Sequence, residues 1–190
     1  RQSFEQAAAV LRRCGQPALE LQARSGLAIA LIYQGRTDEG TRLLCECAEA
    51  LRAGRQWLHL RIVAEDLGTV LAARQPEKAR RWLDEALSAL DQAAQEGATA
   101  LLAGRGPLLF KLAGACYRIG DRQAACRAFE QALPGFDADP DARALAIKTR
   151  VNLGVALIDL GEVQSGLSHI EDALELCRQQ DDDDLLGPTL

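Results

Sequence analysis

The sequence predicts an all-α protein built from repeated helix–turn–helix units. Hydrophobic residues make up 48% of the 190 residues and charged residues 26%, as in a folded chain. Aromatic residues are only 4%, and Ala and Leu dominate, a composition that favours helices over sheets. Apolar residues recur at helical spacing. The same order of Leu, small residue, turn and second apolar stripe occurs four times, which indicates internal repeats.

The four copies align on a leucine that begins each one, at Leu27, Leu67, Leu112 and Leu153. They end at Leu51, Leu87, Leu133 and Leu174. The predicted turns fall at Gly35, Gln75, Gly120 and Gly161, which are spaced 40, 45 and 41 residues apart. A glycine ends a helix where the chain needs a left-handed residue. At Gln75 the following Pro76 instead begins the second helix, because the first turn does not need its missing N–H.

The predicted elements follow from these signals in order. Residues 3–13 form the second helix of a preceding repeat, and the four repeats then span 18–53, 57–95, 98–133 and 140–179. In repeat 3 we expect a long first helix from about residue 98 that is broken near Gly104–Pro107. Asp139 caps the start of repeat 4, with Pro140 in its first turn. Residues 181–190 are predicted as a linker or the start of a further repeat, which gives about nine helices in all.

The fourth copy shows how each hairpin is expected to close. Leu153 and Leu157 lie on one apolar stripe of the first helix, and Ile170 and Ala173 lie on a stripe of the second. Gly166 stands between them in sequence and has no side chain. We therefore expect the two helices to approach closely at Gly166.

This pattern resembles the tetratricopeptide repeat (TPR) family over roughly residues 18–179. The best copy carries the family motif at Leu112, Ala113, Cys116, Gly120, Ala125, Phe129 and Ala132. Two features depart from the motif: Arg24 and Arg150 stand where the family usually has Trp, and the period exceeds the usual 34 or so residues. Periods in the low forties are similar to the variants of kinesin light chains, cell-polarity adaptors and bacterial signalling regulators. The resemblance implies a right-handed superhelix, an α-solenoid of antiparallel hairpins, as a single run over residues 1–190.

The resemblance also implies a concave groove lined by the first helix of each repeat. Copied residue by residue, the partner-binding positions are Ile29, Ile32, Tyr33, Glu65, Thr69, Phe110, Tyr117, Arg118, Lys148, Asn152, Val155 and Asp159. Further groove positions are Gln22, Ser25, Ile62, Ala72, Gly114 and Val151. Such a mixed apolar and polar face suits a peptide or helix of a partner protein. An alternative is that several of these side chains pack against neighbouring helices.

Composition excludes several classes of function. The net charge is −5, from 22 basic and 27 acidic residues, so a basic face for nucleic acid is not expected. No apolar run reaches the roughly 18–20 residues that span a membrane. The sequence has no Met and both ends interrupt the repeat pattern, so we expect a piece of a longer protein with flanking domains.

We find no pattern typical of a catalytic, cofactor or metal site. The two histidines, His59 and His169, stand at no recognisable distance from a nucleophile. Cys45 and Cys47 would point about 200° apart on a helix, so zinc binding is not expected. The run Asp181–Asp184 lacks the spacing of a calcium loop. The six cysteines are interpreted as buried, reduced thiols of a cytoplasmic protein.

The segment Arg80–Trp82 leaves two interpretations open. Two arginines beside an indole could stack on a ligand or bind phosphate. Trp82 beside Leu83 could equally be a core or inter-repeat contact. A second motif is incomplete: Lys148 and Asn152 form only half of the clamp with which some TPR proteins hold a C-terminal carboxylate.

The sequence therefore predicts a non-catalytic protein–protein interaction module, a scaffold or adaptor that presents a pre-organised concave groove to a peptide. No cofactor is expected. The alternative is a sensor or regulatory segment of a larger signalling ATPase or transcription regulator.

Overall fold

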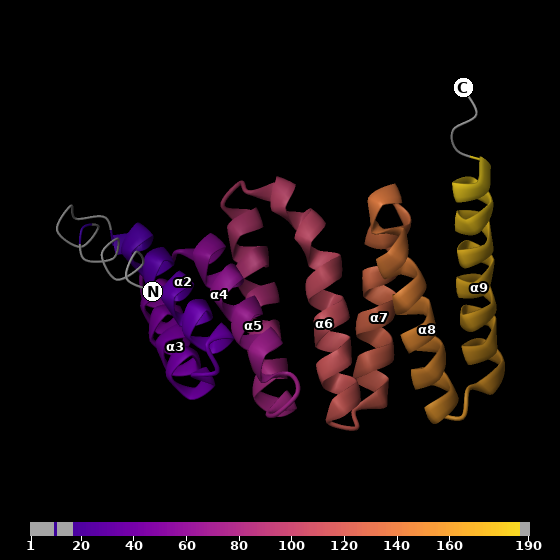
Figure 1. Cartoon of the computed structure of the whole chain (residues 1–190), viewed down its shortest axis with the longest axis horizontal. Coiled ribbons are helices and arrows are strands. Elements are labelled where there is room, and N and C mark those ends of the chain that lie inside the picture. The colour runs from indigo at the N-terminus through magenta and orange to yellow at the C-terminus, as the bar shows by residue number, and fades with distance from the viewer. Residues whose placement is uncertain (1–9, 11–16, 187–190) are drawn as a thin grey trace. The chain divides into compact units, whose positions relative to one another are not determined.

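The computed structural model describes Val10 and residues 17–186 (Figure 1). Within these residues there are eight α-helices, two short 3₁₀ helices and no strand, which confirms the all-α prediction. Of the helix expected at 3–13, only Val10 is described, and it is helical. The chain divides into two compact units, unit 1 (residues 1–102) and unit 2 (residues 103–190). The single run over residues 1–190 stays a prediction.

Unit 1 contains two helical hairpins. The first pairs α2 (Pro17–Tyr33) with α3 (Thr37–Ala53), and the second pairs α4 (Trp57–Leu71) with α5 (Pro76–Gln95). Helix α4 also packs on α3. Leu44, Leu60 and Leu83 are fully buried between these helices. Pro76 begins α5 as expected, and Gly35 has the positive φ of 83° that the first turn requires.

Unit 2 repeats the arrangement. It pairs α6 (Arg105–Arg118) with α7 (Arg122–Asp137), and α8 (Arg143–Asp159) with α9 (Val163–Leu186). Helix α7 packs on α8 (Figure 1). Gly120 and Gly161 have φ near 86° and 87° at the two turns, as the sequence predicted.

The connections between hairpins differ from the expectation in two places. The first helix of repeat 3 does not begin at residue 98: a 3₁₀ helix, η1 (Thr99–Gly104), precedes α6. Before α8, Asp139 Oδ1 accepts a hydrogen bond from the Asp141 N–H at 3.0 Å. The predicted cap is therefore present, but it caps the short 3₁₀ helix η2 (Pro140–Ala142), and α8 follows directly.

The linker predicted from residue 181 is wrong in its first part. Helix α9 continues through Asp181–Asp184 and ends at Leu186. The physical reason is that no Gly or Pro interrupts the sequence between Gly166 and Gly187, so no single residue there breaks the helix.

The hairpins close through glycines that lie against the opposite helix. A Cβ on Gly166 would lie 2.6 Å from the Gly154 carbonyl oxygen and 2.6 Å from Ile158 Cγ1. A Cβ on Gly68 would lie 2.5 Å from Leu83 Cγ. The expected close approach at Gly166 is therefore present, and it involves main-chain atoms directly.

The turn between α3 and α4 is strained at Arg55. Its φ of 53° makes it the one non-glycine residue with positive φ in the described part of the chain. A left-handed conformation costs an ordinary residue about 1–2 kcal/mol, and glycine avoids this cost but loses about 0.5–1 kcal/mol of chain entropy.

We therefore expect Arg55→Gly to raise the free energy of unfolding by about 0.5–1 kcal/mol. Urea denaturation followed by circular dichroism would measure this change. The matched control is Arg55→Ala, which removes the same side chain but keeps the strain, so it should give no gain. An equal gain in both variants would contradict strain as the cause.

Candidate functional site

A pocket of about 370 Å³ opens on unit 2 between α6, α7 and α8. It is lined by Gly114, Tyr117, Arg118, Phe129, Asn152 and Val155. Every lining residue except Phe129 belongs to the face that the sequence analysis chose. The structure therefore brings five of the predicted positions of repeats 3 and 4 together around one hollow, and Phe110, Lys148, Val151 and Asp159 are not among its lining residues.

The floor of this pocket is apolar. Phe129 on α7 is 2% exposed and meets the Phe110 ring edge to face, with 5.8 Å between ring centroids. Phe110, predicted for the groove, is half-buried in this contact. Val155 stays 41% exposed, so an apolar ligand group can cover it. Full burial of such a side chain contributes about 1.5–3 kcal/mol, so covering the exposed part of Val155 contributes less than half of that.

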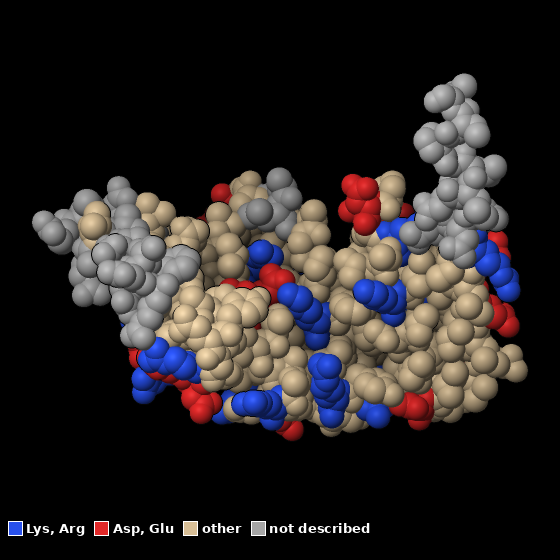
Figure 2. Space-filling model, in the orientation of Figure 1, with Lys and Arg blue, Asp and Glu red and all other residues tan. Residues whose placement is uncertain are grey.

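One basic residue, Arg118, lines the pocket, and a second, Lys148, is exposed one turn from the lining residue Asn152. Arg118 ends α6 and is exposed. Asn152 and Lys148 are exposed one turn apart on α8. Neither Arg118 nor Lys148 has an ion pair with a residue that the structure describes. Figure 2 shows single basic side chains, separated by uncharged surface, over unit 2.

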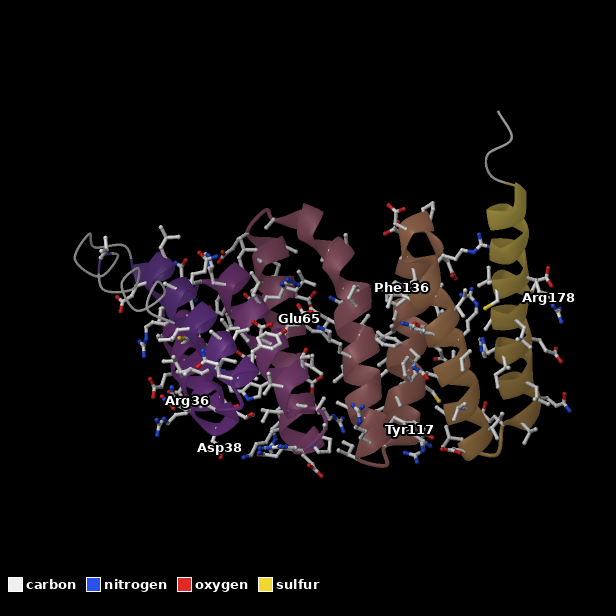
Figure 3. The ribbon with its side chains drawn as sticks, in the orientation of Figure 1. Arg36, Asp38, Glu65, Tyr117, Phe136 and Arg178 are labelled. Carbon is white, nitrogen blue, oxygen red and sulfur yellow. The ribbon has the colours of Figure 1, made fainter. Side chains whose placement is uncertain are left out.

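Two predicted groove residues, Tyr117 and Asp159, bind each other. The Tyr117 hydroxyl donates to Asp159 Oδ2 at 2.7 Å, and Arg122 Nε donates to the same oxygen at 2.9 Å. The Arg122 guanidinium lies 3.9 Å from the Tyr117 ring centroid and also donates to the Tyr117 carbonyl. Tyr117 lies where α6 passes into α7 (Figure 3). This cluster fixes the end of α8 to the turn of the preceding hairpin.

The cluster shifts two pKa values. Hydrogen bonds from Tyr117 and Arg122 hold the pKa of Asp159 below its ordinary value of 3.8. The bond to Asp159 raises the pKa of Tyr117 above its ordinary value of 10.0. Both shifts favour the charged carboxylate beside the neutral phenol at neutral pH.

We expect Asp159→Asn to weaken the dependence of unit 2 stability on acid. Because the pKa of Asp159 is lower in the folded protein, its stabilising effect is complete above the unfolded value of about 3.9. The effect is lost as the pH falls through the folded value. The difference in free energy of unfolding between the wild type and the variant, measured by urea denaturation, should be constant at pH 6–7 and shrink below about pH 4. A difference that does not depend on pH would contradict this interpretation.

Unit 1 has a second pocket, of about 410 Å³, between α2 and α4. It is lined by Gln22, Ser25, Gly26, Ile29, Ala30, Tyr33 and Asp66. Tyr33 is 88% exposed, which is unusual for an aromatic side chain. Ile29 also lines the pocket, as predicted. Ile32 does not, because its side chain lies against Gly40 of α3.

The α4 side of this pocket is acidic. Asp66 lines it directly. Glu65, predicted for the groove, pairs with Arg61 at 3.1 Å. Thr69, also predicted, donates to the Glu65 carbonyl oxygen at 2.9 Å. Glu65 and Thr69 therefore both have partners within α4. Asp66 lines the pocket although it was not among the predicted groove positions. The signal for it was weak, because Asp66 follows Glu65 by one position and both could not be assigned to one face.

The groups considered for chemistry have ordinary surroundings. Burial raises the pKa of the thiols of Cys45, Cys47 and Cys126, so they stay protonated at neutral pH and are poor nucleophiles. Cys14 lies outside the described residues. Among residues that the structure describes, no group of His, Cys, Asp and Glu could hold a metal ion. Within the same part of the chain, no helix is both long and apolar enough to cross a membrane.

Comparison with solved structures decides the fold. BtubC (BKLC) from P. vanneervenii matches with a TM-score of 0.75 at 18% identity, over 94% of this chain and 75% of that one. A putative kinesin light chain of Podosopora anserina, with nearly identical TPR-like repeats, matches with a TM-score of 0.73 at 17% identity, over 94% and 85%. The fold is TPR-like. MamA from MSR-1 also matches, with a TM-score of 0.60 at 17% identity, over 93% and 96%. Neither a protein family nor a curated protein matches the sequence itself.

The TPR-like fold explains the two arginines at the usual Trp position. Arg24 on α2 pairs with Glu46 on α3 at 3.0 Å. Arg150 on α8 makes two bonds of 2.8 Å to the Asp137 carboxylate at the end of α7. In these two repeats an ion pair to an adjacent helix therefore stands at the position where the resemblance expected Trp.

Proposed function

We propose that the chain is a non-catalytic interaction module that holds an extended peptide of a partner protein in the pocket of unit 2. The TPR-like fold supports the general role of a scaffold or adaptor. The observation that carries the specific proposal is the pocket itself: an apolar floor at Phe129 and Val155 beside Arg118 and Asn152. Lys148 is exposed one turn from Asn152 on α8.

The chemistry of the pocket defines the peptide. An apolar side chain fits over Val155 and displaces water from it. An acidic side chain next to it meets Arg118 and Lys148, whose charges have no partner in the described part of unit 2, and Asn152 can donate a further hydrogen bond. The helices are fixed before binding, so the ordering cost falls on the peptide.

The five described cysteines are free. We propose on this ground that the module acts in a reducing compartment such as the cytoplasm.

Selection from a random peptide library would test the proposed groove. We expect the wild type to enrich peptides in which an apolar residue stands beside Asp or Glu. A Val155→Glu/Arg118→Glu variant should lose at least tenfold in affinity for those peptides, measured by fluorescence anisotropy. The matched control is Leu167→Glu/Arg127→Glu, which makes the same changes at exposed positions outside the pocket lining.

Circular dichroism would confirm that both variants fold. Enrichment of basic peptides would contradict the proposal, as would equal losses in the two variants.

A further inference from the structure

A different pocket, of about 300 Å³, lies between α3 and α5 of unit 1. It is lined by Arg52, Lys78, Arg81, Trp82 and Glu85. None of these residues belongs to the groove face of the repeats. The pocket is therefore separate from the proposed peptide site.

Helix geometry gathers these side chains. Residues 78, 81, 82 and 85 lie three and four positions apart, so they share one face of α5. The adjoining stripe of α5, at Ala79, Leu83 and Ala86, is buried in unit 1. Trp82 is half-buried at the edge of that stripe. The inter-repeat contact considered for Trp82 is present, because Arg52 of the preceding repeat lies over its ring. The same ring also lines the pocket.

Among the described residues, one carboxylate lines this pocket, that of Glu85, and it already has a partner. Arg52 Nε donates to Glu85 Oε1 at 2.8 Å. The same guanidinium lies 5.9 Å from the centroid of the Trp82 ring. This pair positions Arg52 at the mouth of the pocket and occupies Glu85.

The remaining polar groups are donors without acceptors. Lys78 and Arg81 are exposed and form no ion pair within the described residues. Arg80, on the same turn, differs because it lies 3.9 Å from Asp84. The Trp82 indole N–H has no acceptor within the described chain either. Three basic side chains against one carboxylate give the lining a formal charge of +2, in a protein whose net charge is −5.

A ligand for this pocket must therefore accept several hydrogen bonds and carry about two negative charges. A phosphate monoester has three acceptor oxygens and a charge near −2 at neutral pH. The pocket is larger than one phosphate group and leaves room for the group that carries it, against the indole. We propose that this pocket binds a phosphate monoester, with Lys78 and Arg81 on the phosphate and Trp82 beside its carrier.

The two tryptophans of the chain make a direct test possible. Trp57→Phe leaves Trp82 as the single indole, so its fluorescence reports on this pocket alone. We would titrate this protein with adenosine monophosphate and with a phosphoserine peptide that lacks aromatic residues. Adenosine and the unphosphorylated peptide are the matched ligands. We expect a saturable change with a phosphorylated ligand, at least tenfold tighter than with its matched ligand.

The outcomes distinguish the source of the phosphate. Binding of the nucleotide alone supports a nucleotide site, and binding of the peptide alone supports a phosphoprotein partner. Binding of both supports recognition of the phosphate itself. Affinity should also rise between pH 5 and 7.5, because the second pKa of the monoester is about 6.

Charge variants test whether binding depends on this pocket or only on the overall charge of the protein. Lys78→Ala/Arg81→Ala should weaken binding at least tenfold. Arg42→Ala/Arg74→Ala removes the same charge from exposed positions of unit 1 outside this pocket and should change affinity less than twofold. Equal losses in the two variants would overturn the proposal, as would the absence of saturable binding or equal binding of phosphorylated and matched ligands.

Discussion

Replacing Gly166 by alanine is expected to destabilise unit 2 by about 2–3 kcal/mol, although alanine is the better helix former. The added Cβ would lie 2.6 Å from the Gly154 carbonyl oxygen and 3.2 Å from the Ile158 backbone nitrogen. Main-chain atoms of a helix cannot move aside as a flexible side chain can, so α8 and α9 would have to separate. Urea denaturation followed by circular dichroism would measure the loss.

The control for this variant is Gly114→Ala, at a helical glycine where a Cβ would meet nothing within 4 Å. That change should stabilise the protein by up to about 1 kcal/mol, through helix propensity alone. The same Gly→Ala substitution should therefore lower the free energy of unfolding at position 166 and raise it at position 114. If both variants were stabilised, the close contact between α8 and α9 would not limit the packing of this hairpin.

Truncation of Phe129 is expected to have an even larger effect. Phe129 is the largest of the fully buried side chains, and its ring packs on Phe110. Phe129→Ala should cost about 3–5 kcal/mol through lost burial and the cavity left behind. A domain has a total stability of about 5–15 kcal/mol. The midpoint temperature of thermal unfolding should therefore fall strongly, or the transition should lose its cooperativity.

The conservative variant Phe129→Leu keeps most of the volume and should cost less than about 1.5 kcal/mol. Because Phe129 also forms the floor of the unit 2 pocket, the two variants separate folding from binding. A folded Phe129→Leu protein that keeps its peptide affinity would show that the floor acts through its volume. Equal destabilisation by both variants would contradict cavity formation as the cause.

The hairpins and their turns could be predicted from the sequence because their signals are local. Gly35, Gly120 and Gly161 each have the positive φ that was expected of a turn glycine. The left-handed turn at Arg55 could not be predicted in this way, because the residue there is not a glycine. The end of α9 was missed because a run of aspartates was interpreted as a linker, although Gly187 and Pro188 are the first true breakers.

The candidate site was only partly predictable, because it depends on pairs far apart in sequence. Helical spacing placed Tyr117 and Asp159 on the same face. Their mutual hydrogen bond across 42 positions required the packing of α8 on the preceding hairpin. In the same way, Ile32 was assigned to the groove although it fills the space beside Gly40. Helical periodicity predicts which face of a helix a side chain lies on. It does not tell whether a side chain on that face lines a groove or packs against a neighbouring helix.

The contact between Gly154 and Gly166 has a consequence for how such a sequence can change over time. The distance between α8 and α9 is set there by two residues that have no side chains, and a larger residue at either one would force the backbones apart. Positions elsewhere in the hairpin require only approximate size and polarity, so substitutions at them are far better tolerated. Gly154 and Gly166 therefore tolerate far fewer substitutions than the rest of the hairpin, where related chains can differ as long as apolar positions stay apolar and of similar volume.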